Sequence, residues 1–382
     1  MKKKHDTLLI VGLGELGGIV LEILARYPNI SKIVAADVDA NWGERKANTA
    51  LMGATYLDLY PDITFEKMDL NNVNETAELL AKIDPHIIYN ASTMQSWWVI
   101  SQLPKDIHDS IYKDFCGLGP WVSQHLFLVY KLMKAVKQAG IDPIVINSSF
   151  PDNVNIILDK VGLGVNVGIG NIDLITAPWR KVVSDKLNVP IRSVNVYAIG
   201  HHYNSYNLGR TGTGLSAPYY LKILVDDEDV TGKFDIKELA SEIPSKAKRT
   251  GGTDINWVVA ATAVKIILGI LFDTKEISHA PGPEGLVGGY PVRLTKNGAE
   301  VFLPENVSLE EAIKINEEAQ KWDGIEKTEE DGTVIFTDIA HETFKKHLNY
   351  DCKKLKINEL EDRVFELDKK YKEFARKHGV NV

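Results

Sequence analysis

A glycine-rich turn between a buried strand and a helix constrains this chain more than any other feature. Residues 7–11, Thr-Leu-Leu-Ile-Val, form an apolar run typical of a strand buried on both faces. The run continues into Gly12-Leu13-Gly14-Glu15-Leu16-Gly17, and apolar residues then recur at helical spacing up to Leu24. In this order Gly12 permits a tight turn, Gly14 lets a phosphate approach, and Gly17 lets the helix pack closely. The stretch predicts a nucleotide-binding unit with phosphates at the helix N-terminus.

An acidic residue after the second predicted strand indicates which dinucleotide would bind. The strand at 32–36 ends in Asp37, 20 residues beyond Gly17. A carboxylate there can accept hydrogen bonds from the adenine ribose hydroxyls and would repel a 2′-phosphate. No Arg or Lys follows until Arg45, so we expect NAD rather than NADP. The alternative is a domain that kept the glycine turn for packing and lost its ligand.

Length and composition are those of an ordinary globular protein. The chain has 382 residues, of which 44% are hydrophobic and 25% charged, which is enough for two domains. The net charge of −8 gives no support for binding to nucleic acid or to an anionic membrane. Cys116 and Cys352 form no spacing motif, the longest apolar stretch is interrupted by Lys265, and no signal-peptide pattern is visible. We therefore expect a cytoplasmic protein without a membrane span.

Strands alternate with helices over the first 170 residues. After the first two strands, the pattern predicts strands at 63–65, 86–91, 144–147 and 164–168, with helices at 44–52, 74–83 and 121–139. This alternation predicts an α/β fold of the Rossmann type, a doubly wound parallel sheet. The ends of the second and fourth strands, Val38 and Asn90-Ala91-Ser92, should form the lip of the cofactor crevice. The irregular stretch 92–120 is long for a loop, which is typical of a lid.

The pattern changes beyond residue 170. It predicts helices at 171–187, 255–272 and 308–322, a strand at 191–199, and a hairpin turning at Asn297-Gly298. We expect an NAD-binding domain at 1–170, an α+β catalytic domain at 171–345 and a helical extension at 346–382. The last helix, 358–376, has an apolar stripe that would pack on its own domain or on another subunit.

Two short segments carry the best candidates for proton transfer. Asp173 stands at the start of a predicted helix, and His202 follows the apolar strand that ends at Ile199. Hydride transfer between a carbinol carbon and nicotinamide needs a group that exchanges the hydroxyl proton, and histidine titrates near neutrality. A carboxylate on the other ring nitrogen would fix the tautomer. From spacing alone, a loop histidine and a helix-capping aspartate stay the alternatives.

The order of these motifs resembles the lactate and malate dehydrogenase superfamily. It runs from the glycine-rich turn through Asp37, Asn147, the Gly-Ile-Gly-Asn-Ile-Asp at 168–173 and the Ile-Gly-His-His at 199–202 to the glycine-rich hairpin at 282–300. The resemblance covers most of residues 7–322. It implies NAD as the cofactor, Asp173 and His202 as the catalytic pair, and Asn147 as a contact to the substrate and the nicotinamide ribose.

The sequence departs from that family where the substrate carboxylate is bound. The family has an arginine three residues after the catalytic aspartate, where this chain has Thr176, and further arginines on a mobile loop. This chain has no arginine between Arg45 and Arg180, so a plain lactate or malate dehydrogenase is not expected. Arg180 and Arg210 are the candidates to replace the missing clamp, with surface salt bridges as the alternative for each.

The predicted function is an NAD-dependent oxidoreductase that interconverts a secondary alcohol and its ketone, on a hydroxy acid or a sugar-type substrate. Trp97, Trp98, Trp121, Tyr203 and Tyr206 suit a bulky ligand but equally a core or an interface. Two alternatives are a glycosidase-like NAD-dependent hydrolase, which would need a metal, and a non-catalytic NAD(H) sensor. We expect no metal, no nucleic-acid or membrane partner, a small-molecule substrate, and a homodimer or homotetramer.

Overall fold

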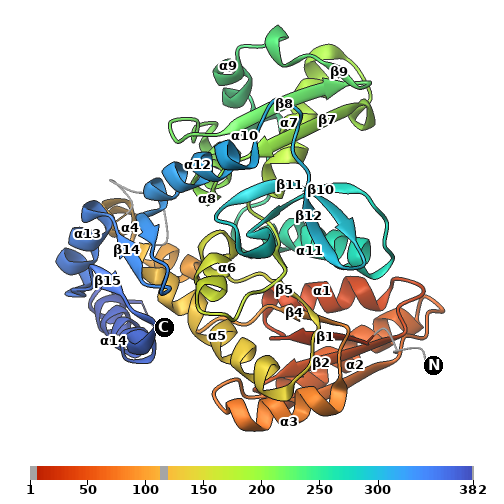
Figure 1. Ribbon diagram of the computed structural model, residues 1–382, viewed down its shortest axis with the longest axis vertical. Coiled ribbons are helices and arrows are strands. Elements are labelled where there is room, and N and C mark those ends of the chain that lie inside the picture. The colour runs from red at the N-terminus through yellow and green to blue at the C-terminus, as the bar shows by residue number, and fades with distance from the viewer. Residues whose placement is uncertain (1–6, 112–118, 381–382) are drawn as a thin grey trace.

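A six-stranded parallel sheet forms the centre of the N-terminal half (Figure 1). The computed structural model describes residues 7–111 and 119–380. The strand order is β3-β2-β1-β4-β5-β6, and the predicted Rossmann sheet is confirmed. The strands are β1 (Thr7–Val11), β2 (Lys32–Asp37), β3 (Ile63–Lys67), β4 (Ile87–Asn90), β5 (Ile144–Asn147) and β6 (Val167–Gly168).

The period-two alternation of β1 divides the core into two halves. Leu8 and Ile10 face one side, where they join the apolar cluster of α1, α2 and α11. Leu9 and Val11 face the other side, with α3, α5 and α6. Both faces of β1 are therefore buried, as its unbroken apolar run predicts. The helices are α1 (Glu15–Ala25), α2 (Ala40–Thr55), α3 (Val73–Ile83), α5 (Val122–Ala139), α6 (Pro151–Lys160) and α11 (Ile255–Leu271).

Helix α6 was not predicted. Its first turn carries the polar residues Asp152 and Asn153, which are fully buried, and its apolar residues Val154, Ile157 and Leu158 lie in the turns that follow. Pro151 occupies the first helical position, where its missing N–H costs nothing, and Phe150 enters with a left-handed φ of 43°. The polar first turn of α6 faces the candidate site described below.

Two antiparallel sheets lie between residues 194 and 301, after the Rossmann sheet. One is formed by β7 (Val194–Ile199), β8 (Tyr220–Val225) and β9 (Glu228–Asp229), and the other by β10 (Ile277–Pro281), β11 (Gly289–Thr295) and β12 (Gly298–Val301). Gly200, just after β7, exchanges backbone hydrogen bonds with Gly289, so the two sheets are joined at the segment that leads to His202. This arrangement confirms the predicted α+β region. Its helices are α7 (Asp173–Leu187), α8 (His202–Thr211), α9 (Ile236–Ser241), α10 (Ile243–Lys246) and α12 (Leu309–Ala319).

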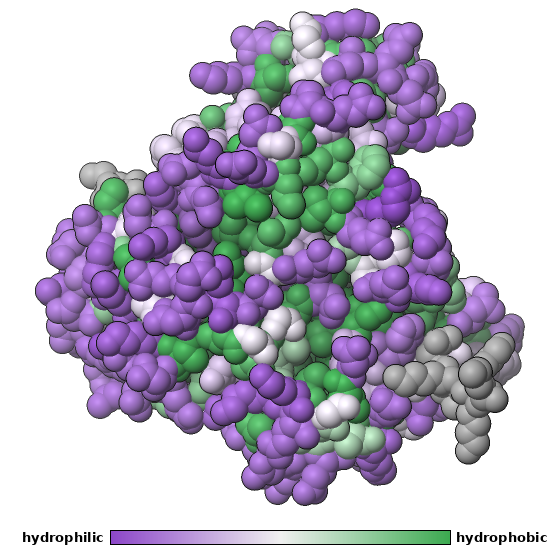
Figure 2. Space-filling model, viewed as in Figure 1, coloured by the Kyte–Doolittle hydropathy of each residue, from purple (hydrophilic) through white to green (hydrophobic). Residues whose placement is uncertain are grey.

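The viewed surface is mostly hydrophilic, and the long apolar stretch forms a packed helix. Figure 2 shows hydrophilic residues over most of the viewed face, with apolar residues gathered in its middle over the β10–β12 sheet. Within the two described ranges, no helix has the length and apolarity to cross a membrane. The long apolar stretch is instead α11, which packs against α1.

The segment expected to be an irregular lid is partly helical. It contains a 3₁₀ helix at Trp97–Gln102 and α4 (Lys105–Ile111). Residues 112–118, which include Cys116, lie outside the described residues. Trp121, one of the aromatic residues considered for a ligand wall, is fully buried against Tyr371 at 5.1 Å between ring centroids, so it belongs to the core.

The C-terminal region is larger than the predicted helical extension. It comprises β13 (Ile325–Thr328), β14 (Val334–Phe336), α13 (Asp338–Leu348), β15 (Lys354–Leu355) and α14 (Leu360–Lys377). The boundary expected at 345 falls inside α13, because the short strands before it left no clear sequence pattern. The apolar stripe of α14 faces α5 of its own chain, and Tyr371 donates a hydrogen bond to the Val99 carbonyl at 2.6 Å. The stripe therefore packs within the chain.

We expect Leu367→Ala to lower the free energy of unfolding by about 2–5 kcal/mol, because Leu367 is fully buried in the α14 stripe and its truncation leaves a cavity. Lys369→Ala on the same helix is the matched control, since Lys369 is exposed. Urea titration followed by far-UV circular dichroism measures both. Equal stability of the two variants would contradict the packing of α14 on α5.

Candidate active site

The glycine-rich turn accepts only glycine at two of its positions. Gly12 has a φ of +89°, and a Cβ there would meet the Ser92 backbone nitrogen at 2.9 Å. A Cβ on Gly17 would lie 1.9 Å from the Gly12 carbonyl oxygen. A Cβ on Gly14 would meet no atom within 4 Å, and Gly14 caps α1 without a side-chain hydrogen bond. The turn therefore leaves open space in front of the α1 N-terminus, where a phosphate group fits.

Asp37 ties the end of β2 to this turn. Its Oδ2 accepts a hydrogen bond from the Leu13 backbone N–H at 2.6 Å, and its Oδ1 accepts one from Asp39 N–H at 3.0 Å. The Trp42 indole donates to the Leu13 carbonyl at 2.9 Å, and Val38 is 56% exposed beside it. Each carboxylate oxygen keeps a lone pair for a further donor. The predicted cofactor-contact residues of the turn, the β2 end and the β4 end thus lie along one edge of the sheet.

Asn147 is saturated by hydrogen bonds within the protein. Its Oδ1 accepts from Asn90 Nδ2 at 3.0 Å and from Ser149 N–H at 2.9 Å. Its Nδ2 donates to Asn155 Oδ1 at 2.9 Å and to the Ser149 carbonyl at 3.2 Å. All four hydrogen-bonding positions of the amide are used. Asn147 thus joins β4 to β5 by hydrogen bonds. Its side-chain amide has no donor or acceptor position left for the contact to substrate or ribose that the family resemblance implies.

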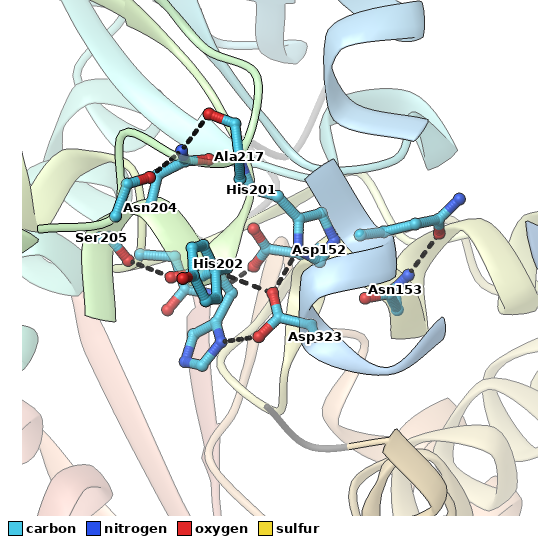
Figure 3. A network of polar contacts seen from close by, with 12 residues as sticks. Asp152, Asn153, His201, His202, Asn204, Ser205, Ala217 and Asp323 are labelled. Carbon is cyan, nitrogen blue, oxygen red and sulfur yellow. Dashed lines mark hydrogen bonds and ion pairs between the residues drawn. The ribbon is translucent and has the colours of Figure 1, made fainter. Parts of the chain in front are cut away.

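His202 stands at the first position of α8, beside a carboxylate that the sequence did not suggest (Figure 3). Asp323 ends the 3₁₀ helix at Gln320–Asp323 and is fully buried. Its Oδ1 lies 2.9 Å from His202 Nδ1, and its Oδ2 lies 2.6 Å from His201 Nδ1. The Tyr203 backbone N–H also donates to Oδ2 at 2.8 Å. One carboxylate therefore contacts three consecutive residues at the start of α8.

The charges around His202 favour its protonated form. Burial lowers the pKa of His202, but the negative charge of Asp323 and their hydrogen bond outweigh this, so the pKa is raised. Burial acts to raise the pKa of Asp323, and the two histidines nevertheless hold it below its usual value. Asp152, to which Asn171 donates a hydrogen bond, is also buried nearby, and burial raises its pKa. The pair of His202 and Asp323 is thus polarised toward imidazolium and carboxylate.

A third histidine in the same region is held neutral. His125 on α5 is buried, with Nδ1 3.0 Å from Ser149 Oγ, and burial lowers its pKa to about 3. The Phe150 ring lies edge-on between it and His202, with centroids 6.2 Å from His125 and 5.4 Å from His202. Because Phe150 follows β5 by three residues, His202 lies at the carboxyl edge of the parallel sheet.

The predicted pairing of His202 with Asp173 is wrong in this structure. Asp173 Oδ1 lies 3.8 Å from Lys265 Nζ on α11 and 3.3 Å from the Thr176 hydroxyl, and burial raises its pKa. The Nδ1 atom of His202 is taken by Asp323 instead. Asp323 is 121 residues away along the chain, just after the helix with the Ser308–Glu311 capping box, and no local motif marks it.

The two candidate arginines lie in different places. Arg180 donates from Nη2 to Asn195 Oδ1 at 3.2 Å, near the start of β7, whereas His202 follows the end of that strand. The Arg210 guanidinium lies 3.9 Å from the Tyr206 ring centroid, and the Tyr206 ring lies 5.7 Å from the His202 ring. Positions 202, 206 and 210 share one face of α8. The structure therefore brings Arg210, and not Arg180, to the face of α8 that carries His202.

In residues 7–111 and 119–380, no group of three or more His, Cys, Asp or Glu side chains is arranged to hold a metal ion. Of the aromatic residues considered for a ligand wall, Tyr203 packs on Trp322 at 5.1 Å between centroids.

Comparisons with known proteins identify relatives in one superfamily. No model of a protein family matches the sequence. A malate dehydrogenase of Haloferax volcanii is 26% identical over 167 residues, 41% of this chain and 51% of that protein. An L-lactate dehydrogenase of Pseudothermotoga lettingae is 25% identical over 306 residues, 77% of this chain and 87% of that protein.

A solved structure shares the fold. The lactate dehydrogenase of Cryptosporidium parvum, solved with lactic acid and nicotinamide adenine dinucleotide, aligns with a TM-score of 0.54 at 16% identity, over 96% of this chain and 98% of that one. This chain is similar in sequence to lactate and malate dehydrogenases and shares their fold. The matched sequence spans only about half of the Haloferax volcanii malate dehydrogenase, at 51%.

Two buried histidines make stability depend on pH. Burial lowers the pKa of both His125 and His279 to about 3, whereas an unfolded histidine titrates near 6.5. Between these values the unfolded chain binds more protons, so stability falls as the pH falls from about 6.5 to 3. His202 acts with the opposite sign, since its raised pKa adds stability that is present below about 6.5 and lost as the pH rises through its folded value.

We expect His125→Gln to reduce the slope of unfolding free energy against pH by up to about 1.4 kcal/mol per pH unit between pH 4 and 6. The physical reason is the removal of one group that is neutral when folded and protonated when unfolded. Urea titrations at several pH values measure the slope in the parent protein and in the variant. Identical slopes would show that His125 is not held neutral.

Proposed function

We propose that this chain is an NAD-dependent oxidoreductase that interconverts a secondary alcohol and its ketone on a hydroxy-acid or sugar-type substrate. The observation that carries the proposal is the position of His202, whose Nδ1 contacts a buried carboxylate at 2.9 Å on the carboxyl edge of the parallel sheet. The glycine-rich turn opens at the same edge. Ligands of open α/β sheets bind there.

The residues of the turn fit the dinucleotide. Open space beyond Gly14 and the uncapped N-terminus of α1 would hold the pyrophosphate, and Asp37 would accept from the adenine ribose. When bound, NAD supplies the hydride acceptor or donor. Asn256 on α11 donates to Glu15 Oε2 at 3.0 Å, which links the start of the second region to the start of α1. The cytoplasmic location and the homodimer or homotetramer stay predictions.

His202 would exchange the substrate proton through Nε2. Its Nδ1 is committed to Asp323, so Nε2 is the ring nitrogen left for the substrate. In the oxidation direction neutral His202 accepts the hydroxyl proton at Nε2, and in the reduction direction the imidazolium returns it. The 12% of the side chain that remains exposed is consistent with access to a small molecule.

The substrate is not expected to be plain lactate or malate. The position of the family's carboxylate-binding arginine is Thr176, whose hydroxyl donates to the Asp173 carbonyl at 2.8 Å. Arg210 is the sequence-predicted cation that lies on the His202 face of α8, and we assign it to the substrate. A guanidinium there can bind a carboxylate or hydroxyl groups of a larger molecule.

The first experiment is NAD⁺ reduction, followed at the nicotinamide absorbance, with a panel of hydroxy acids, sugars, sugar acids and polyols, each with and without divalent metal. We expect turnover of at least one hydroxy acid or sugar-type compound without added metal. Tight NADH binding with no turnover on any compound would favour the sensor. Turnover only with metal and on glycosides would favour the hydrolase.

We expect His202→Gln to lower kcat by about two orders of magnitude or more, because proton transfer to a positioned base is lost. NADH affinity, measured by fluorescence titration, should stay near that of the parent protein, since the turn and Asp37 are untouched. A kcat equal to that of the parent protein would show that His202 does not exchange the substrate proton.

We expect Arg210→Ala to raise KM for the best substrate of the panel by about tenfold or more, since a charge-assisted hydrogen bond contributes about 1.5–3 kcal/mol. Arg180→Ala makes the same change on α7, where the guanidinium contacts Asn195, and should change KM far less. Steady-state kinetics of both variants decide between them. A larger rise in KM for Arg180→Ala than for Arg210→Ala would indicate that Arg180, on the helix that begins at Asp173, binds the substrate.

A further inference from the structure

Asp323 is fixed by hydrogen bonds of the residues around it, and it lies one residue beyond residues 7–322, whose sequence motifs resemble the dehydrogenase family. The residue after it, Gly324, adopts a left-handed φ of 84° and its carbonyl accepts from Thr337 N–H at 3.0 Å. Gln320, at the other end of the 3₁₀ helix, accepts a hydrogen bond from Asn153 Nδ2 at 3.0 Å. The turn that carries Asp323 is thus tied on one side to α6 and on the other to the C-terminal region.

The two carboxylate oxygens of Asp323 have different partners. Oδ2 is occupied by His201 Nδ1 and by the Tyr203 backbone N–H, so the carboxylate cannot rotate without breaking both hydrogen bonds. Oδ1 is left for His202 Nδ1 (Figure 3). An ionised carboxylate only accepts, so both histidines are assigned a proton on Nδ1. This assignment directs the lone pair of neutral His202 to Nε2.

We propose that Asp323 is the positioning residue for His202 and stabilises its imidazolium, the role that the family gives to the position of Asp173. The inference rests on the proposed function, because it assumes that His202 exchanges the substrate proton. During oxidation the hydroxyl proton moves to Nε2, the Nδ1 proton stays on the ring, and the positive charge that forms lies beside the Asp323 carboxylate. Asp323 itself takes no proton.

Several other titratable groups lie near His202. Asp152 on α6 acts in the same direction as Asp323, and Arg210 on α8 acts in the opposite direction. His125 on α5 interacts with the charge of His202, and His201 shares the carboxylate. Asp173 is not in this group, because the cations that act on it are Lys265 and Arg180.

Asp173 therefore supplies a matched control for a test at Asp323. Both residues are buried aspartates, and Asp323→Asn and Asp173→Asn each replace a carboxyl group by an amide with almost no change in volume. The readout is the titration of the His202 ring, followed by NMR of histidine-labelled protein and assigned with His202→Gln. We expect Asp323→Asn to lower the pKa of His202 by about one to three units, and Asp173→Asn to leave it in place.

The outcomes separate positioning from a purely structural role. A lowered pKa of His202, together with a kcat that falls while NADH affinity holds, supports the proposal. An unchanged pKa of His202 in Asp323→Asn, even with reduced stability, would overturn it. A drop in that pKa in Asp173→Asn would also overturn it, and this measurement remains available if Asp323→Asn does not fold.

The same experiments distinguish failure of this inference from failure of the proposed function. If His202→Gln keeps parent-like kcat, the proposed function fails, while the NMR titration still measures whether Asp323 governs the His202 ring. If His202→Gln loses turnover but Asp323→Asn leaves the pKa of His202 unchanged, the function stands and the positioning role is removed.

Discussion

The buried carboxylate of Asp323 is the contact on which the candidate site depends. A carboxylate without exposure is costly unless donors surround it, and here two imidazole N–H groups and one backbone N–H do so. These three donors come from consecutive residues, His201 to Tyr203, at the start of α8. Asp323 therefore fixes both the N-terminus of the helix and the orientation of the ring at its first position. The helix N-terminus in turn favours the negative charge.

The assignment of the positioning role to Asp323, and not to Asp173, is consistent with the absence of the family's arginine at position 176. With Thr176 at that position, the nearest cation to Asp173 is Lys265, at 3.8 Å and partly exposed, and its distance implies a weak pair. A buried Asp173 with little compensation has a raised pKa and is a poor partner for an imidazolium. Asp323 has the opposite shift, because two histidines act on it. Electrostatics alone thus favours Asp323 as the orienting group.

The sequence predicted the sheet and the glycine-rich turn well because both are encoded by local patterns. β5 has the predicted bounds, and Gly12 and Gly17 sit where a Cβ would collide with backbone. His202 follows the apolar strand as the sequence predicts, but helix α8, which begins at His202, was not predicted. The role of Asp323 could not be predicted, because it depends on a contact across 121 residues that leaves no periodic trace. At Asn147 the residue of the family motif is present, but its side-chain amide is fully used in hydrogen bonds to neighbouring residues such as Asn90 and Asn155.

The C-terminal region links the site to the segment that follows β4. Its strands begin directly after Gly324, so the turn that carries Asp323 is continuous with β13. Its last helix reaches back to α5, where Gln124 donates to the Val364 carbonyl at 2.8 Å, and to the Val99 carbonyl through the Tyr371 hydroxyl. Val99 lies in the 3₁₀ helix at the start of the expected lid. The C-terminal region therefore contacts both the turn that carries Asp323 and the 3₁₀ helix at Trp97–Gln102.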